Sequence, residues 1–498
     1  VHFGEWNPHY FRNPPGFSYM NAAWFPFWLQ IQTPVYVPEW LGIDPLRLRP
    51  STRVKATFLY RPFDLVAGAR MLAALLGACT ILWVFLLARE FVGKHLALGA
   101  SALYTVSFLS VRDSHFATND MAMAFWVTLA GWLMVKAYRG DRTRDWILAS
   151  ALGGIAVAMK YNAFPLLLAL GVLRFLSLKK GEAPFSWLIY VRSCLLYGGV
   201  AVLTFLLICP FPFLDPSTFW NEIRDLSEKS QNQWSGQANI WSGWMLLDTL
   251  YTSEGGLTLL FALLGLGLAC ARWQWELILF PLLYSLLIMT HPLFFARFAI
   301  PLLPWLALLA LLGIRETVGR WRCRNAGMGI LLLLCLIQPL AKDLRFHALM
   351  RQTDTRIQCV HWFKTSVPEP VLIAAGMFGI PIPYRNVEPP WSTLLDTRFV
   401  LIDTLPTDEL SRLDQLSYPL RYIALSHFDP FPGHWPEFLE ERRQAVCRYL
   451  QTEKPIQVFS PFRDGWEGRV DVEDSYAPFR DLWSRSGPGP QIEIYQRS

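Results

Sequence analysis

Charged residues are scarce in this chain. Asp, Glu, Lys and Arg make up only 17% of its 498 residues, whereas 53% of the residues are hydrophobic. A soluble protein usually carries about a quarter charged residues. The shortage argues against an ordinary soluble domain as the main body of the chain and points to a membrane protein.

Metal-type cysteine spacing and internal repeats are also missing. The eight cysteines have no metal-ligand spacing, and the sequence contains no repeat and no low-complexity tract. Transporters commonly contain inverted repeats and helices that are broken at the middle of the membrane. These absences speak against a cysteine-based metal centre and against a transporter, although a transporter stays an alternative.

Long apolar segments, in contrast, recur along the chain. Segments of roughly 17–25 mostly apolar residues can cross a bilayer as helices, and a helix satisfies its own backbone hydrogen bonds in lipid. We therefore predict a polytopic α-helical membrane protein with about ten transmembrane helices in this chain. The predicted spans are 66–88, 94–110, 119–137, 145–160, 163–178, 193–213, 254–271, 275–290, 298–314 and 326–342.

Basic residues are divided unequally between the two sets of connections that these spans create. The set that runs from Arg89 to Arg324 holds about 15 Lys and Arg residues, and the alternate set holds about five. Because cytoplasmic loops carry the excess of basic residues, the first set is predicted to be cytoplasmic. The loop around Asp113, the loop 214–253 and the tail after 342 then lie outside. The net charge of +6 therefore reflects topology and does not indicate nucleic-acid binding.

Three regions differ in composition. Residues 1–60 contain no clean span, and their Trp-rich stretch is interrupted by Pro26, so we predict an extracytoplasmic loop with short juxtamembrane helices. Residues 61–344 hold the predicted spans and form the transmembrane domain. In residues 345–498 the apolar runs shorten to strand length, as at 371–375, and alternate with helical stretches such as 435–451. This alternation predicts an extracytoplasmic α/β domain.

The start of the chain does not agree with this topology. The chain begins with Val1, and no export signal precedes Gly16, yet residue 1 is predicted to lie outside. We therefore expect that one earlier transmembrane helix is missing from this sequence.

Ionisable groups gather at the ends of the predicted helices on the outer side. Such groups at the edge of a membrane are costly and indicate function by default. Helices packed as a bundle can bring these ends together at one outer rim. The four connections concerned are His9–Pro15, Ser110–Asp120, Lys160–Asn162 and His291–Arg297.

These residue types fit a site for a phosphate-bearing lipid. Lys160, Arg297 and Arg12 are candidates to bind the anionic head while the tail stays in the bilayer. Asp120 and Asp113 are candidates to activate an acceptor hydroxyl, or to hold a divalent cation against a phosphate leaving group. Metal ligands are not identified by any spacing. The residues predicted to line the cavity are His9, His115, Tyr161, Asn162 and His291.

Structural roles explain the same residues one at a time. Arg112 and Asp113 form a local ion pair in this alternative, and Asp120 caps a helix whose dipole favours a carboxylate. Lys160 and Arg297 reach lipid headgroups. The remaining groups then serve as helix-end, capping or solvated surface residues: His291, Glu254, Asp215, Glu222, Asp225 and Glu228. The confinement of the candidate residues to one side of the membrane favours a site.

The order of these segments resembles the GT-C superfamily of membrane glycosyltransferases. It is most similar to glycosyltransferase family 39, which includes dolichyl-phosphate-mannose protein mannosyltransferases and aminoarabinose transferases of lipid A. The resemblance extends over essentially the whole chain. It rests on Phe3–Phe11 with Pro14, Pro15 and Tyr19, on Arg112–Asp120, on Met159–Ala163, on Arg297–Pro304, and in the tail on Asp354–Trp362 and Gly487–Tyr495.

The resemblance implies a polyprenyl-phosphate-linked sugar donor and an inverting transfer on the outer face. It carries the second acidic position of the family onto Asp120, with Asp113 close by. The family's principal catalytic Asp, in its first outer loop, has no match here, and Glu5 is not its equivalent. Arg12 and Asn13 stand where the aminoarabinose branch has Glu and Lys, with that Glu as a zinc ligand. This departure puts metal binding and that substrate in doubt.

We therefore expect a membrane glycosyltransferase of the bacterial inner membrane. It would transfer a hexosyl- or pentosyl-type sugar from a polyprenyl-phosphate donor to an extracytoplasmic protein, lipid or glycan. A divalent cation is the one cofactor considered. The alternatives are a lipid-phosphate phosphatase or phosphotransferase, a transporter, and a catalytically inactive family member that serves as a structural subunit.

Overall fold

The protein divides into two compact units. Unit 1 comprises Val1–Asn232 and Ile240–Asp343, and unit 2 comprises Gln233–Asn239 and Leu344–Ser498. The computed structural model describes residues 7–31, 54, 57, 62–181, 184–231, 240–320, 322–367, 372–375, 398–401, 420–426, 444, 446–452, 454–463, 473 and 477–496. Much of the predicted N-terminal loop, the motif residues 3–6 and most of the helical stretch 435–451 therefore lie outside the described residues.

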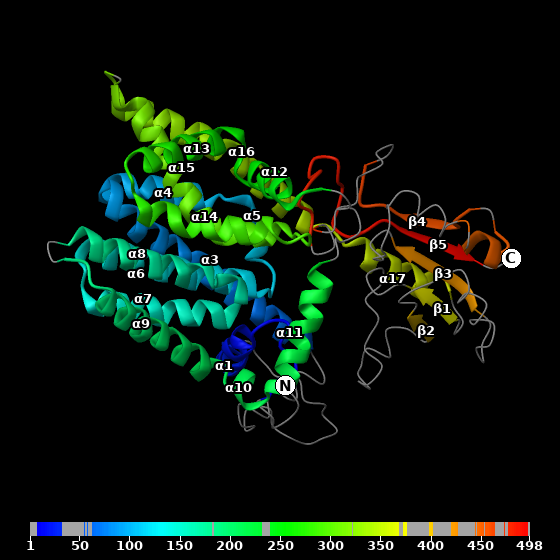
Figure 1. Ribbon diagram of the computed structural model, residues 1–498. Helices are drawn as coiled ribbons and strands as arrows, with labels where there is room; N and C mark the ends of the chain where they lie inside the picture. Colours follow the sequence, from blue (N-terminus) through cyan, green and yellow to red (C-terminus); the bar gives the residue numbers. More distant parts are fainter. Residues whose placement is uncertain are drawn as a thin grey trace. The chain divides into compact units, whose positions relative to one another are not determined.

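Unit 1 is built from helices that pack side by side as a bundle (Figure 1). Its main helices are α1 (Gly16–Ile31), α3 (Pro62–Val92), α4 (Lys94–Thr105), α5 (Phe108–Asp113), α6 (Asn119–Gly140), α7 (Thr143–Met159), α8 (Pro165–Lys180), α9 (Trp187–Ile208), α10 (Phe211–Leu214), α11 (Pro216–Ser230), α12 (Ser242–Glu254), α13 (Gly256–Ala271), α14 (Trp275–Met289), α15 (Leu303–Thr317) and the start of α16 (Arg324–Met350). The short 3₁₀ helix η3 (Tyr161–Ala163) connects α7 to α8. A second one, η4 (Ala296–Leu302), leads into α15.

All ten predicted spans fall on helices, but not all of these helices can cross a membrane alone. Within the described residues, six stretches are long and apolar enough, or up to seven if one bent pair counts as a single span. The six are Asp64–Val92, Asn119–Gly140, Tyr161–Lys180, Trp187–Ile208, Ala296–Thr317 and Arg324–Phe363. The predicted number of about ten crossings stays a prediction.

The predicted span 94–110 is broken in the structure, and the predicted span 254–271 begins at a sharp bend. The span 94–110 is divided into α4 and α5, and 12-residue α4 is only about 18 Å long at 1.5 Å per residue. The helix expected over 254–271 starts at Gly256, and α12 meets it at an angle of 118°. Gly255 makes this bend with φ of 83°, a conformation that costs glycine little.

Small residues allow the helices of unit 1 to pack closely. A Cβ atom on Gly265 of α13 would overlap the carbonyl oxygen of Leu309 on α15, and one on Gly313 of α15 would overlap the carbonyl oxygen of Phe261. Close approach of backbones at small residues is the usual way in which helices associate in membranes. The glycines therefore set the spacing of the α13–α15 pair.

The aromatic N-terminal stretch forms one helix rather than an interrupted one. Helix α1 continues through Pro26. Trp24 Nε1 donates to the carbonyl oxygen of Gly68 at 2.8 Å, and Trp28 Nε1 donates to that of Asp64 at 2.9 Å. Both acceptors lie on α3, so the indole N–H groups dock α1 against the first turns of α3.

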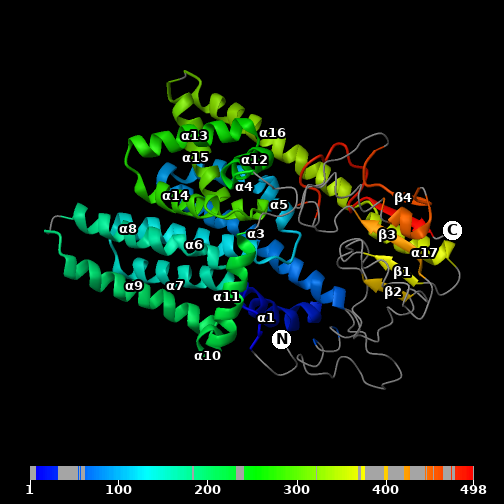
Figure 2. The same cartoon turned by 45° about the vertical axis from the view of Figure 1, so that its right-hand side comes forward.

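Unit 2 holds a five-stranded mixed sheet, seen edge-on beside helix α17 (Thr355–Ser366) in Figure 2. The strand order is β2-β1-β3-β5-β4, with β1 parallel to β2 and β3, and β5 antiparallel to β3 and β4. Buried Cys359 and Phe363 of α17 pack in one cluster with Ile492 and Ile494. The strands are β1 (Leu372–Ala375), β2 (Arg398–Leu401), β3 (Leu420–Ser426), β4 (Gln457–Phe459) and β5 (Ile492–Gln496).

Candidate lipid-phosphate site

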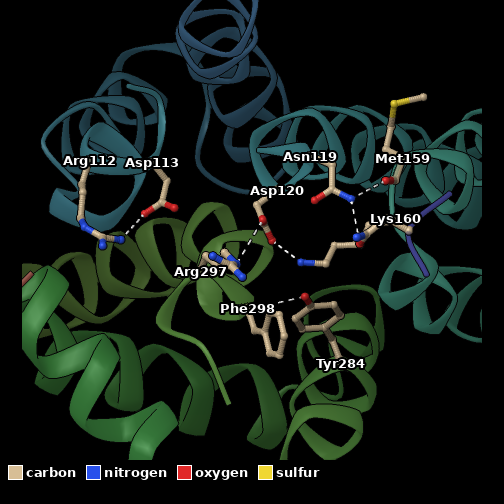
Figure 3. Close-up of polar contacts among 10 residues, drawn as sticks. Arg112, Asp113, Asn119, Asp120, Met159, Lys160, Tyr284, Arg297 and Phe298 are labelled. Atoms are coloured by element: carbon tan, nitrogen blue, oxygen red, sulfur yellow. Dashed lines mark hydrogen bonds and ion pairs between the residues drawn. The ribbon is translucent and has the colours of Figure 1, made fainter. Parts of the chain in front are cut away.

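The carboxylate of Asp120 lies at the centre of the polar cluster in unit 1. Asp120 is in the first turn of α6, where the helix dipole favours a negative charge, and it is only 1% exposed. Its Oδ1 lies 2.5 Å from Lys160 Nζ, and its Oδ2 lies 3.7 Å from Arg297 Nε (Figure 3). Asp120 therefore holds two cations, a role that goes beyond capping a helix.

The two cations come from separate short connections. Lys160 ends α7 in an extended conformation, immediately before η3, and Arg297 lies in η4. Lys160 is buried, and the side chain of Arg297 is 16% exposed. Both side chains contact Asp120 instead of only extending to headgroups, so the structure brings together three residues that are far apart in sequence.

Neighbouring groups fix the geometry of Lys160. Asn119 Nδ2 donates to the carbonyl oxygen of Met159 at 3.0 Å, which joins the start of α6 to the end of α7. Lys160 Nζ lies 4.6 Å from the centre of the Phe298 ring, and the Phe298 carbonyl oxygen accepts a bond from Tyr284 at 3.0 Å. Figure 3 shows these side chains converging from α6, α14 and the two connections. Such support restricts the ammonium group to one position.

Arg112 and Asp113 form a second, separate pair. Arg112 Nη1 lies 2.9 Å from Asp113 Oδ2, and both residues are at most 2% exposed. The local ion pair expected as the structural alternative is therefore present, but it is buried. Burial raises the pKa of Asp113, and the guanidinium of Arg112 opposes that rise. Figure 3 shows the pair on the side of Arg297 that lies away from Lys160.

Two of the three predicted histidines contact helix backbone. Nδ1 of His115 lies 2.8 Å from the carbonyl oxygen of Val111, and Nδ1 of exposed His291 lies 2.9 Å from that of Leu287. Each contact spans four residues, as expected for a helix-end role. Tyr161 and half-buried Asn162 directly follow Lys160 in η3.

Arg12 contacts α11, and His9 contacts the residue just before this helix. Arg12 Nε lies 3.1 Å from Glu222 Oε2, and its Nη2 lies 2.5 Å from Asp225 Oδ2. His9 Nδ1 lies 3.6 Å from Asp215 Oδ2. The acidic face of α11, expected to be only solvated, therefore binds the N-terminal segment.

Glu254 belongs to a buried network that the sequence did not reveal. Its Oε1 accepts hydrogen bonds of 2.5 Å from both Ser107 and Ser253, and Ser253 Oγ accepts the N–H of Leu109 at 3.0 Å. The network joins the α4–α5 break to the α12–α13 bend. The sequence signal at this position was an acidic residue before two glycines, and this pattern predicted only a helix cap.

The cluster around Asp120 can hold an anion. A buried carboxylate keeps two cations close together, and both cations are of the types that bind phosphate oxygens. Over the residues described here, no group of three or more His, Cys, Asp or Glu side chains could hold a metal ion. The divalent cation stays a prediction.

One segment of unit 1 matches a known family. Residues 64–211 match the family model of dolichyl-phosphate-mannose-protein mannosyltransferase. The predicted resemblance to this family is confirmed for this segment. The motifs Arg112–Asp120 and Met159–Ala163 lie inside this segment, whereas the other motifs lie outside it. The protein is thus an integral membrane protein with a segment that is similar to a membrane glycosyltransferase family.

The relatives match this chain either over part of their length or at low identity. An undecaprenyl phosphate-α-4-amino-4-deoxy-L-arabinose arabinosyl transferase of Pseudomonas fluorescens is 30% identical over 147 residues, which are 29% of this chain and 26% of that protein. ArnT from Cupriavidus metallidurans bound to undecaprenyl phosphate is 13% identical, with a TM-score of 0.48, over 97% of this chain and 88% of that one. The apo oligosaccharyltransferase of Archaeoglobus fulgidus is 12% identical, with a TM-score of 0.47, over 84% and 62%.

Proposed function

We propose that the protein transfers a sugar from a polyprenyl-phosphate donor to an extracytoplasmic acceptor. The observation that carries this proposal is the pairing of Lys160 and Arg297 on Asp120 within unit 1. The match of residues 64–211 to a family that uses a lipid-phosphate-linked sugar supports it. The name of the Pseudomonas fluorescens relative suggests undecaprenyl phosphate as the lipid.

Lys160 and Arg297 bind the donor phosphate in this proposal. Two cations repel each other, and Asp120 offsets that repulsion while the site is empty. A phosphate group then places further negative charge beside cations that are already positioned, so little reorganisation is needed. We do not include Arg12 among the phosphate-binding residues, because its guanidinium already contacts Glu222 and Asp225.

Asp120 and Asp113 position neighbouring groups in this proposal. Asp120 contacts two cations and Asp113 contacts Arg112. We therefore propose that Asp120 orients the phosphate-binding cations and that Asp113 helps to orient the acceptor.

The remaining features of the proposal concern the surroundings of the site. We propose that the site faces the outside of a bacterial inner membrane, because the basic residues favour that topology. We also propose that unit 2 is extracytoplasmic. The other proposed cavity residues are His9, His115, Tyr161, Asn162 and His291.

Binding of undecaprenyl phosphate to the purified full-length protein tests the phosphate site. Lys160→Met and Arg297→Met should each weaken binding by about 10- to 150-fold, since a hydrogen bond to a charged group contributes roughly 1.5–3 kcal/mol. The matched controls Lys94→Met and Arg272→Met remove exposed cations outside the cluster and should leave the Kd unchanged. Equal binding by all four variants contradicts the assignment.

Transfer itself is measured separately. Membranes that contain the full-length protein are supplied with undecaprenyl-phosphate-linked pentoses and hexoses, and released undecaprenyl phosphate is quantified by mass spectrometry. We expect release from at least one donor, and a strong loss of release in the Asp120→Asn variant. Wild-type rates in that variant would exclude a role for Asp120 in the reaction.

A further inference from the structure

The N-terminal segment contacts the chain at two places, one just before helix α11 and one within that helix. Asn7 Nδ2 donates to Asp215 Oδ2 at 2.9 Å just before the helix begins. Arg12 contacts Glu222 and Asp225 about two turns further on. The blue N-terminal segment and α11 lie side by side in both views (Figure 1, Figure 2). We call residues 7–13 together with α11 the N-terminal clasp.

An aromatic contact fills the space between these two attachment points. Phe11 is fully buried, and its ring meets that of Phe219 edge to face at a centroid distance of 5.9 Å. The Tyr161 ring lies 6.5 Å from the Phe219 ring, and the Tyr161 hydroxyl donates to the Phe11 carbonyl oxygen at 3.1 Å. The clasp therefore packs directly on η3.

The clasp also contacts the start of α6. Asn119 Nδ2 lies 3.4 Å from Asn13 Oδ1, and the same amide binds the Met159 carbonyl oxygen. Both neighbours of Lys160 are thus connected to the clasp. Tyr161 binds Phe11 of the clasp directly, and Met159 binds Asn119, which contacts Asn13 of the clasp. A displacement of the clasp would be transmitted to Lys160 through both neighbours.

From this arrangement we infer that Arg12 is a positioning residue. It fastens α11 to residues 7–13, and the closed clasp holds η3 so that the Lys160 ammonium group stays aligned with Asp120 and Arg297. The inference rests on the proposed donor-phosphate site and adds a residue that acts on it without touching the donor. The observation that favours this role over a simple surface ion pair is geometric, since one guanidinium contacts two carboxylates beside a buried aromatic residue.

A charge exchange tests the clasp in the full-length protein. The variants are Arg12→Glu, Glu222→Arg and the two combined. The matched control is Glu228→Gln, which breaks the exposed Arg224–Glu228 pair on the same helix. Two quantities are measured for each variant: the rate of chymotrypsin cleavage after exposed Trp220, and the Kd for undecaprenyl phosphate.

We expect Arg12→Glu to increase cleavage several-fold and to raise the Kd by about tenfold, which corresponds to about 1.4 kcal/mol of binding free energy. The combined exchange should restore both values toward wild type, a rescue that a general loss of packing would not show. Glu228→Gln should change neither quantity.

Each other result overturns a defined part of the inference. Unchanged cleavage in Arg12→Glu means that Arg12 does not fasten α11. Faster cleavage with an unchanged Kd means that the clasp does not position Lys160. If Lys160→Met also leaves the Kd unchanged, or the wild type binds no undecaprenyl phosphate, the proposed phosphate site itself fails and the positioning role with it.

Discussion

Replacement of Asp120 by Asn tests the electrostatic account of the site most directly. The change removes a buried negative charge that lies 2.5 Å from Lys160 Nζ and 3.7 Å from Arg297 Nε. At an effective dielectric constant of about 20, these distances correspond to attractions of roughly 7 and 4–5 kcal/mol before desolvation is subtracted. Both cations would lose their counterion, and their mutual repulsion would no longer be offset.

The expected net cost is smaller than these attractions. Removal of one partner from a buried ion pair destabilises a protein by about 3–5 kcal/mol, because the remaining charge is left uncompensated. The asparagine oxygen still accepts a hydrogen bond from Lys160, so we expect about 3–4 kcal/mol. At about 2 °C per kcal/mol for a large chain, the midpoint of thermal unfolding should fall by roughly 6–8 °C.

A double-mutant cycle separates this cost from a general packing defect. Thermal unfolding in detergent, followed by tryptophan fluorescence, is measured for Asp120→Asn, Lys160→Met and the two combined. Because the double variant removes one of the uncompensated cations, it should be at least as stable as Asp120→Asn, with a coupling energy of about 2 kcal/mol. Additive losses, or a wild-type midpoint in Asp120→Asn, would refute the account.

Two further predictions concern helix packing and pH. Gly265→Ala should destabilise the protein by about 1–3 kcal/mol, because its new methyl group would overlap the backbone of α15. Gly267→Ala, on the same helix with open space around it, should be neutral in the same unfolding assay; equal midpoints would contradict the close packing. The hydrogen bond from Asn7 lowers the pKa of Asp215. The stabilisation by this hydrogen bond is therefore fully present above the unfolded value near 3.9 and is lost as pH falls through the lower folded value. Cleavage of α11 by pepsin, which is active at acid pH, should accelerate there, but not in Asp215→Asn.

The sequence by itself determined the class of protein and the residues that deserved attention. Apolar runs of membrane length predict helices without any tertiary information, because each helix satisfies its own backbone. The family resemblance followed from ordered motifs, of which Arg112–Asp120 and Met159–Ala163 lie in the matched segment. Lys160, Arg297 and Asp120 were selected because ionisable groups at helix ends are costly in a membrane.

The partners of these residues depended on tertiary structure. Periodicity gives the face of a helix but no contact between residues 40 or 177 positions apart, so the pairing of Asp120 with Lys160 and Arg297 required the bundle. The same limit applies to Arg12. Its residue type and position in the sequence fitted a phosphate ligand, but in the structure it contacts Glu222 and Asp225 of α11.

The broken helices show this division most clearly. The mostly apolar composition of residues 94–110 predicts a single span. The break at Ser107 is accompanied by hydrogen bonds to Glu254 and Ser253, which come from a bend about 150 residues later. The sequence thus predicted which segments are apolar enough for a membrane, and the tertiary structure decided where helices end and which charges meet, because those choices depend on partners supplied by distant segments.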